Sequence, residues 1–163
     1  MALGDITPLK DGNFGSTGGV THQVTSGGTP PAINAGEMVL KTLGNQYVTA
    51  MATNKPVVGT DYVAGISQTT STETASVAGT VTVTPLVPGQ IWLIAPKVAA
   101  SWNTQALYNA NVGKRVLIDV TSGTATILAA DSANNGCVVE NLDIARYPGK
   151  VAFSVRAGAS YLA

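Results

Sequence analysis

Alternation of apolar and polar residues with a period of two constrains the fold of this chain more than any other feature. The stretch GTVTVTPLVPGQIWLI, residues 79–94, sets Val81, Val83, Ile91 and Leu93 against polar or small neighbours. Successive side chains of a β-strand point to opposite faces of the sheet. The pattern therefore predicts strands with one buried face and one solvated face.

Turn signals separate further predicted strands from Ala35 onward. Proline donates no ladder hydrogen bond, so Pro85 and Pro88 are expected to end the strand that begins near Gly79 or to place it at a sheet edge. Turns are predicted at Gly44-Asn45, Ser122-Gly123, Asn135-Gly136 and Pro148-Gly149. The expected inward side chains of the strands are Met38, Leu40, Tyr47, Tyr62, Ala64, Ile66, Val77, Val81, Val83, Val116, Ile118 and Val120.

One short helix is predicted in SWNTQALYNANVGK, residues 101–114. Ser101 is the expected N-cap, and Gly113 is placed where a left-handed residue would end the helix. Trp102 is interpreted as a core side chain, as are Trp92, Tyr108 and Phe153. Many short strands with one helix predict an all-β fold, either a small β-barrel or a sandwich.

The first 32 residues differ from the rest of the chain. They are rich in Gly, Thr, Ser and Pro, with scattered apolar residues, and Pro30-Pro31 ends the stretch. Such a composition buries too little apolar surface to offset the entropy of ordering the chain. We therefore expect residues 1–32 to be an extended, flexible N-terminal arm that orders on a partner, followed by a β-rich domain over residues 33–163.

The charge balance argues against several classes of partner. Nine basic and nine acidic side chains give a net charge of zero, so no global field attracts nucleic acid or an anionic membrane. We expect neither as a partner. The opening MALGDITPLK lacks the basic start and apolar core of a signal peptide, which predicts synthesis and assembly in a reducing cytoplasm.

Few residues offer catalytic or metal-binding chemistry. His22 lies in the glycine-rich segment, and Cys137 is the single cysteine, which we interpret as a small buried residue. Glu140 and Asp143 would point to opposite faces of a strand, which disfavours a carboxylate pair. We expect no enzymatic activity, catalytic residue, cofactor or metal, although DSANNG at residues 131–136 leaves a calcium site near Asp131 open.

The order of the segments resembles the capsid decoration, or cement, proteins of tailed bacteriophages. A Gly/Thr-rich start is followed by AGEMVL, YVAGIS, GTVTVTPLVPGQIW, YNANVGKRVLIDVTSGTATILAADSANNGCVVENLDI and YPGKVAFSVR. The resemblance covers most of residues 35–156. It implies a compact β-barrel-like domain, commonly trimeric, that binds major capsid proteins on the outside of a mature head and stabilises their contacts, with an N-terminal arm reaching over the shell.

On this interpretation the capsid contacts are made by the arm. The arm residues expected to touch the major capsid protein are Phe14, Val20, His22 and Val24. Three alternatives stay open: another virion component such as a head fibre base or tail protein, a carbohydrate-binding module, and a small hydrolase that uses Glu140 and Asp143.

Overall fold

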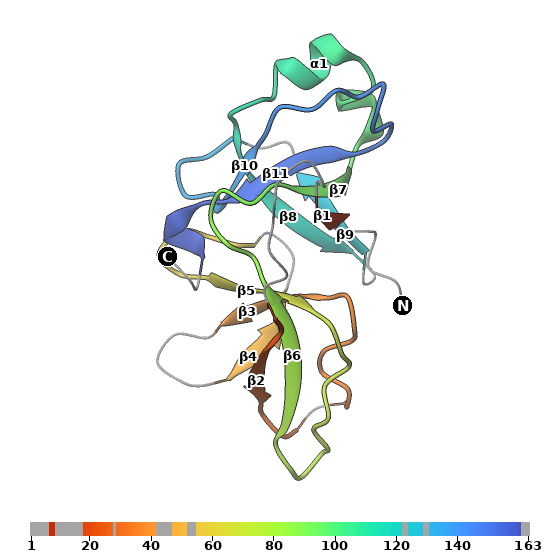
Figure 1. Cartoon of the computed structure of the whole chain (residues 1–163). Helices are drawn as coiled ribbons and strands as arrows, with labels where there is room; N and C mark the ends of the chain where they lie inside the picture. The colour runs from red at the N-terminus through yellow and green to blue at the C-terminus, as the bar shows by residue number, and fades with distance from the viewer. Residues whose placement is uncertain are drawn as a thin grey trace.

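The chain folds into two β-sheets and a short helical region (Figure 1). A computed structural model describes residues 7–8, 18–27, 29–41, 47–51, 55–121, 124–128 and 131–160. The predicted all-β fold class is confirmed, with a barrel as its larger unit. No helix within these segments combines the length and the apolar composition that crossing a membrane requires.

The first sheet closes into a five-stranded barrel. Its strands are β7 (Trp92–Pro96), β8 (Arg115–Thr121), β9 (Thr124–Leu128), β10 (Cys137–Val139) and β11 (Val151–Val155). They follow the order β7-β11-β10-β8-β9, and a parallel pairing of Ala95 with Thr126 returns β9 to β7. Beside this seam, the short strand β1 (Thr7–Pro8) pairs antiparallel with β7 at Leu93 and Trp92.

The second sheet is antiparallel and curled. Its strands are β2 (Val20–Val24), β3 (Met38–Lys41), β4 (Val48–Ala50), β5 (Tyr62–Ser67) and β6 (Gly79–Pro85). They follow the order β2-β6-β5-β3-β4, and a parallel bridge between Gln23 and Tyr47 brings the two edge strands together. The hairpins β3–β4 and β8–β9 form where the sequence predicts them, although their turns at residues 44–45 and 122–123 lie outside the described residues.

Strand β3 of the curled sheet lies between the two hydrophobic cores. Met38 and Leu40 enter the larger core, which fills the barrel, whereas Val39 enters the smaller core inside the curled sheet. Strand side chains alternate between faces, so one strand can supply both cores. Near Gly65 a register shift between β3 and β5 breaks the expected alternation: Ala64 joins the smaller core, whereas Ile66 packs against the larger core.

Most of the predicted core is confirmed. The buried members are Met38, Leu40, Ala64, Val81, Val83, Trp92, Trp102, Tyr108, Val116, Ile118, Cys137 and Phe153. Tyr47, Tyr62, Ile66 and Val120 are half-buried. Val77 was expected inside, but it is 62% exposed because it lies in the turn before β6, where its N–H donates to Thr74 Oγ1 at 3.0 Å.

The predicted helix is shorter than expected and begins later. Ala99–Ser101 forms a 3₁₀ turn, and α1 spans Gln105–Asn109. Ser101 is not the N-cap, because it already belongs to that turn; Thr104 has extended backbone and its side chain accepts from the Leu107 N–H at 3.2 Å. Gly113 is left-handed as predicted, with φ of 80°.

The expected boundary of the arm at residue 32 also needs correction. Residues 20–24 form β2, which pairs with β6 at five positions. Further along, the Ala32 N–H donates to a carboxylate oxygen of Glu73, and the Ile33 N–H donates to Ser71 Oγ at 3.0 Å. Strand β6 and the side chains of Ser71 and Glu73 supply the hydrogen-bond partners for this polar segment. The ordered fold therefore includes residues 20–24 and 29–33.

Candidate interaction surface

Three of the residues expected to contact a partner point into the curled sheet. Val20 lies opposite Val83 and His22 opposite Val81, so both point to the inner face of the sheet together with their buried partners. Val24 is 2% exposed and belongs to the smaller core, so the expectation that it contacts a partner is corrected. His22 is half-buried, and Val20 is 42% exposed at the rim.

The fourth residue, Phe14, lies outside the described residues. Burial lowers the pKa of His22, and the positive charge of Lys41 lowers it further. The imidazole is therefore neutral at pH 7, where it adds no charge to the sheet.

The outer face of the same strands carries hydroxyl and amide groups. Alternation places Thr21 opposite Thr82 and Gln23 opposite Thr80, on the side away from the smaller core. We name this surface the threonine face; its members are Thr21, Gln23, Gln68, Thr80, Thr82 and Thr84. Strands β2, β5 and β6 contain no acidic or basic residue other than the neutral His22. The threonine face is consequently polar but uncharged.

Hydrogen bonds hold some of these side chains in place. Gln68 donates from Nε2 to Thr84 Oγ1 at 2.6 Å, and Thr72 Oγ1 lies 3.5 Å from Thr80 Oγ1. The backbone N–H of Thr82 donates to Thr69 Oγ1 at 3.1 Å. Ordered side chains lose less conformational entropy when a partner covers them.

The chain that leads into β2 runs close against the threonine face. A Cβ on Gly19 would lie 2.4 Å from Thr82 Cγ2 and 2.5 Å from Gln68 Oε1, far inside van der Waals contact. A larger residue here would require the Thr82 and Gln68 side chains to move. The contact places Gly19 next to the threonine face.

Glu73 fastens the chain between β2 and β3. It is 5% exposed; one carboxylate oxygen accepts from the Ala32 N–H, while Oε2 has no hydrogen-bond partner among the described residues. Burial raises the pKa of Glu73, but hydrogen bonds from the Ala32 N–H, from Ser71 and from its own backbone together outweigh burial, so the pKa lies below its usual value. No sequence pattern identifies this role.

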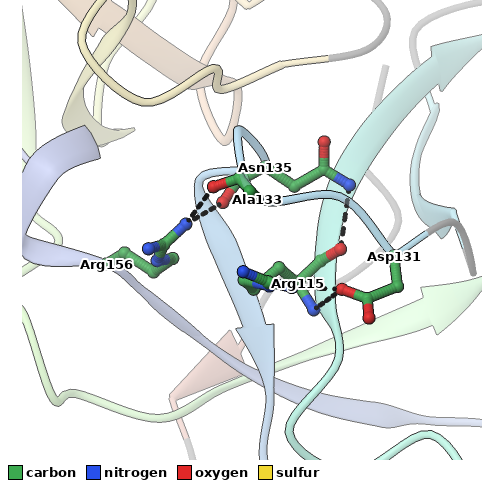
Figure 2. A network of polar contacts seen from close by, with 5 residues as sticks. All are labelled: Arg115, Asp131, Ala133, Asn135 and Arg156. Atoms are coloured by element: carbon green, nitrogen blue, oxygen red, sulfur yellow. Dashed lines mark hydrogen bonds and ion pairs between the residues drawn. The ribbon is translucent and has the colours of Figure 1, made fainter.

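The candidate calcium loop, residues 131–136, is held by arginine side chains (Figure 2). The Arg115 N–H and Nε donate to Asp131 Oδ1 at 3.0 and 3.3 Å. Arg156 Nη1 donates to the carbonyl oxygens of Ala133 and Asn135 at 2.8 and 2.9 Å. Asp131 Oδ1 and the carbonyl oxygens of Ala133 and Asn135 therefore already accept hydrogen bonds from guanidinium and backbone donors. Within the described segments, no three acidic, His or Cys side chains gather as ligands.

The remaining reactive groups take part in local structure. Glu140 Oε1 accepts from Ser154 Oγ at 2.5 Å, and Asp143 Oδ1 accepts from the Ala145 N–H at 3.0 Å. Cys137 is buried in the barrel, and burial raises the pKa of its thiol to about 12. His22 belongs to the other sheet.

Comparison with protein-family models, with curated proteins and with solved structures finds no match to this chain. The threonine face corresponds in the sequence to the alternation TVTVT at residues 80–84, in which the valines face inward and the threonines outward.

Proposed function

We propose that this protein is a capsid decoration, or cement, protein of a tailed bacteriophage. It binds the outer surface of the mature head, stabilises contacts between major capsid proteins, and is made in the host cytoplasm before it joins the virion. The observation that carries the proposal is the uncharged threonine face with the N-terminal segment lying against it at Gly19.

The chemistry of the threonine face suits burial against another protein. Removing a charge from water is costly unless it is paired, whereas burying a hydroxyl or amide costs less and is offset by hydrogen bonds to the partner. Thr21 and Thr80 are exposed on this face without a charged neighbour in their strands. A partner's backbone and polar side chains can satisfy such groups across an interface.

The N-terminal segment supports the same function. Its residues pair with both sheets, through β1 in the barrel and through β2 in the curled sheet. A segment of low apolar content gains order by lying on another surface, which lets it cover a wide area of a partner. Many copies bound to one lattice would stabilise the assembled shell by mass action. Neither catalysis nor a cofactor has a part in this function.

A head fibre base or a tail protein shares these features, and location in the particle distinguishes those alternatives. A carbohydrate-binding module would present aromatic rings to solvent. Here Trp92 and Trp102 are 5% and 4% exposed, so neither supplies such a platform.

The test is a pull-down on purified phage heads, both unexpanded and expanded and emptied of DNA. Four proteins are compared: the full chain, a chain that begins at Gly18 and so keeps β2, Thr21→Arg on the threonine face, and the matched control Thr60→Arg. Thr60 is an exposed threonine in a turn of the segment between β4 and β5.

We expect saturable binding of the full chain to expanded heads. Removal of residues 1–17 and the Thr21→Arg change should each weaken it by about tenfold or more, because an interface loses most affinity at a few central contacts. Thr60→Arg should bind like the full chain. Absence of binding to both kinds of head would refute the proposal and leave the tail and carbohydrate alternatives.

A further inference from the structure

A close ion pair lies where the barrel closes. Lys97 Nζ is 2.5 Å from Asp119 Oδ2, and the side chain of Asp119 is 2% exposed whereas that of Lys97 is 46% exposed. The ion pair between Lys55 and Asp61 is longer, at 3.0 Å, and its carboxylate is 12% exposed. Lys97 and Asp119 therefore make a closer contact around a more buried carboxylate.

This pair spans the seam of the barrel. Lys97 directly follows β7, and its N–H donates to the Ile127 carbonyl of β9 at 3.0 Å. Asp119 belongs to β8 and pairs with Thr126 of β9. Strand β9 lies between β7 and β8, and it is joined to β7 by a short parallel pairing. The side chains of Lys97 and Asp119 thus meet across β9, at the place where that pairing closes the barrel.

The backbone holds the two reactive groups in one arrangement. Because Lys97 and Asp119 are both tied to β9 by the backbone, the amine and the carboxyl group stay next to each other. Groups that one molecule holds in a reactive geometry behave as if their concentration were about 10⁵–10⁸ M. Burial of Asp119 keeps bulk water from its carboxyl carbon, which disfavours hydrolysis of a bond formed there. The exposed side of Lys97 gives a released water molecule a way out.

The ion pair itself is costly at this position. A carboxylate that is removed from water loses its hydration, and attraction to the neighbouring ammonium repays this loss only in part. A neutral amide in place of the two charges would remove that cost. Condensation is therefore favoured more at Asp119 than at a carboxylate that stays in contact with water.

We propose that Lys97 and Asp119 condense into an intramolecular amide cross-link in the folded protein. The ammonium of Lys97 first gives one proton to Asp119 Oδ2, which leaves a neutral amine and a carboxylic acid. The lone pair of Nζ then attacks Cγ, the Cγ–Oδ2 bond breaks, and a second proton from Nζ leaves with Oδ2 as water. One Nζ–Cγ bond is formed and one water molecule is released, without an oxidant, a metal or a cofactor.

The cross-link joins β7 to β8 across β9 and closes a covalent loop over residues 97–119. Like a disulfide, a covalent loop restricts the unfolded chain and so stabilises the folded one. It also keeps the barrel closed under a load that would separate strands held by hydrogen bonds alone. The inference concerns the barrel and does not depend on binding to phage heads.

The test is the intact mass of the purified full-length protein, measured after denaturation, for wild type, Lys97→Arg and Lys55→Arg. Arginine keeps the positive charge, but its guanidinium is not deprotonated in proteins and supplies no free amine. Lys55→Arg is the matched control, because the ion pair of Lys55 with Asp61 is longer and more accessible to water. Far-UV circular dichroism checks that each variant folds, and tryptic peptide mapping by tandem mass spectrometry locates the bond.

We expect wild type and Lys55→Arg to be lighter than their sequences by one water molecule, and Lys97→Arg to have its full mass. In wild type, trypsin should not cleave after Lys97, and one branched peptide should contain both Lys97 and Asp119. A wild type with its full sequence mass and cleavage after Lys97, or a loss of water located elsewhere in the chain, would overturn the inference. Either result leaves the proposed function standing, because head binding is measured separately.

Discussion

The hydroxyl of Tyr108 accepts a hydrogen bond from the backbone N–H of Ala152 at 2.9 Å. This contact links α1 to β11, across 44 residues of sequence. Tyr108 is fully buried, and its ring meets that of Trp102 edge-on at 5.6 Å between centroids. Burial raises the pKa of Tyr108 to about 12, which keeps the hydroxyl protonated as a donor to Glu140.

Replacing Tyr108 by Phe should lower the free energy of unfolding by about 1–3 kcal/mol, because a buried N–H and a buried carbonyl lose their partner. Urea unfolding followed by circular dichroism measures the change. Tyr147→Phe, at a half-buried tyrosine, serves as the matched control. Equal stability of the two variants would contradict the structural role assigned to the Tyr108 hydroxyl.

Gly65→Ala should destabilise the curled sheet. A Cβ at Gly65 would lie 1.9 Å from the carbonyl oxygen of Thr84, so β5 and β6 would have to move apart. Overpacking of this kind costs about 1–3 kcal/mol or more. A shift of the urea midpoint reports it. Gly18→Ala is the control, since no atom lies within 4 Å of its Cβ position; a Gly65→Ala protein as stable as that control would disprove the close approach.

His22 should make stability depend on pH. Burial, and then the charge of Lys41, lower the folded-state pKa of His22 below the value of 6.5 in the unfolded chain. Between these two pKa values the unfolded chain binds more protons, so the free energy of unfolding falls as pH decreases from about 6.5 through the folded pKa. Unfolding of wild type and His22→Gln across this range should show the decline in wild type alone. The same slope in both proteins would assign it to other groups.

Cys137 should be inert in the native protein. It is fully buried and its thiol pKa is raised to about 12, so little thiolate is available and reagents cannot reach it. Iodoacetamide at pH 8 should modify the chain after unfolding in urea, with little reaction before, as measured by mass spectrometry. Rapid alkylation under native conditions would show that the barrel opens around β10.

Strands and their inward faces were predictable where alternation is regular. Val81 and Val83, like Val116 and Ile118, are buried as their period of two requires. Val77 follows the same period but lies beyond the end of the strand, and local alternation contains no information about where a ladder begins. Long-range pairing decides that point, since the β6 ladder with β2 starts at Gly79.

The structure of residues 20–24 could not be obtained from composition. Their sequence, VTHQV, alternates, but glycine- and threonine-rich surroundings indicate a segment without a core of its own. β6 lies 55 residues or more away in the sequence and supplies both the ladder and the inner neighbours of Val24. Likewise, the Ala32 N–H that donates to Glu73 lies 41 residues earlier in the sequence, and no local pattern reveals this contact.

The composition of the candidate interaction surface could be predicted from the sequence, but its position could not. Low charge and abundant hydroxyl side chains indicate a surface suited to contact. The register of β2 on β6 then decides which side chains face outward, and it assigns Val20, His22 and Val24 to the inner face and Thr21 to the outer face. A shift of one residue would exchange the two sets.

Strand β3 has a mechanical consequence. Met38 and Leu40 on one side and Val39 on the other belong to one strand, so a load on the curled sheet reaches the barrel core through packed side chains. A chain built this way should deform as a single stiff element rather than hinge between its halves. A force applied to one sheet would then be resisted by the packing of both hydrophobic cores.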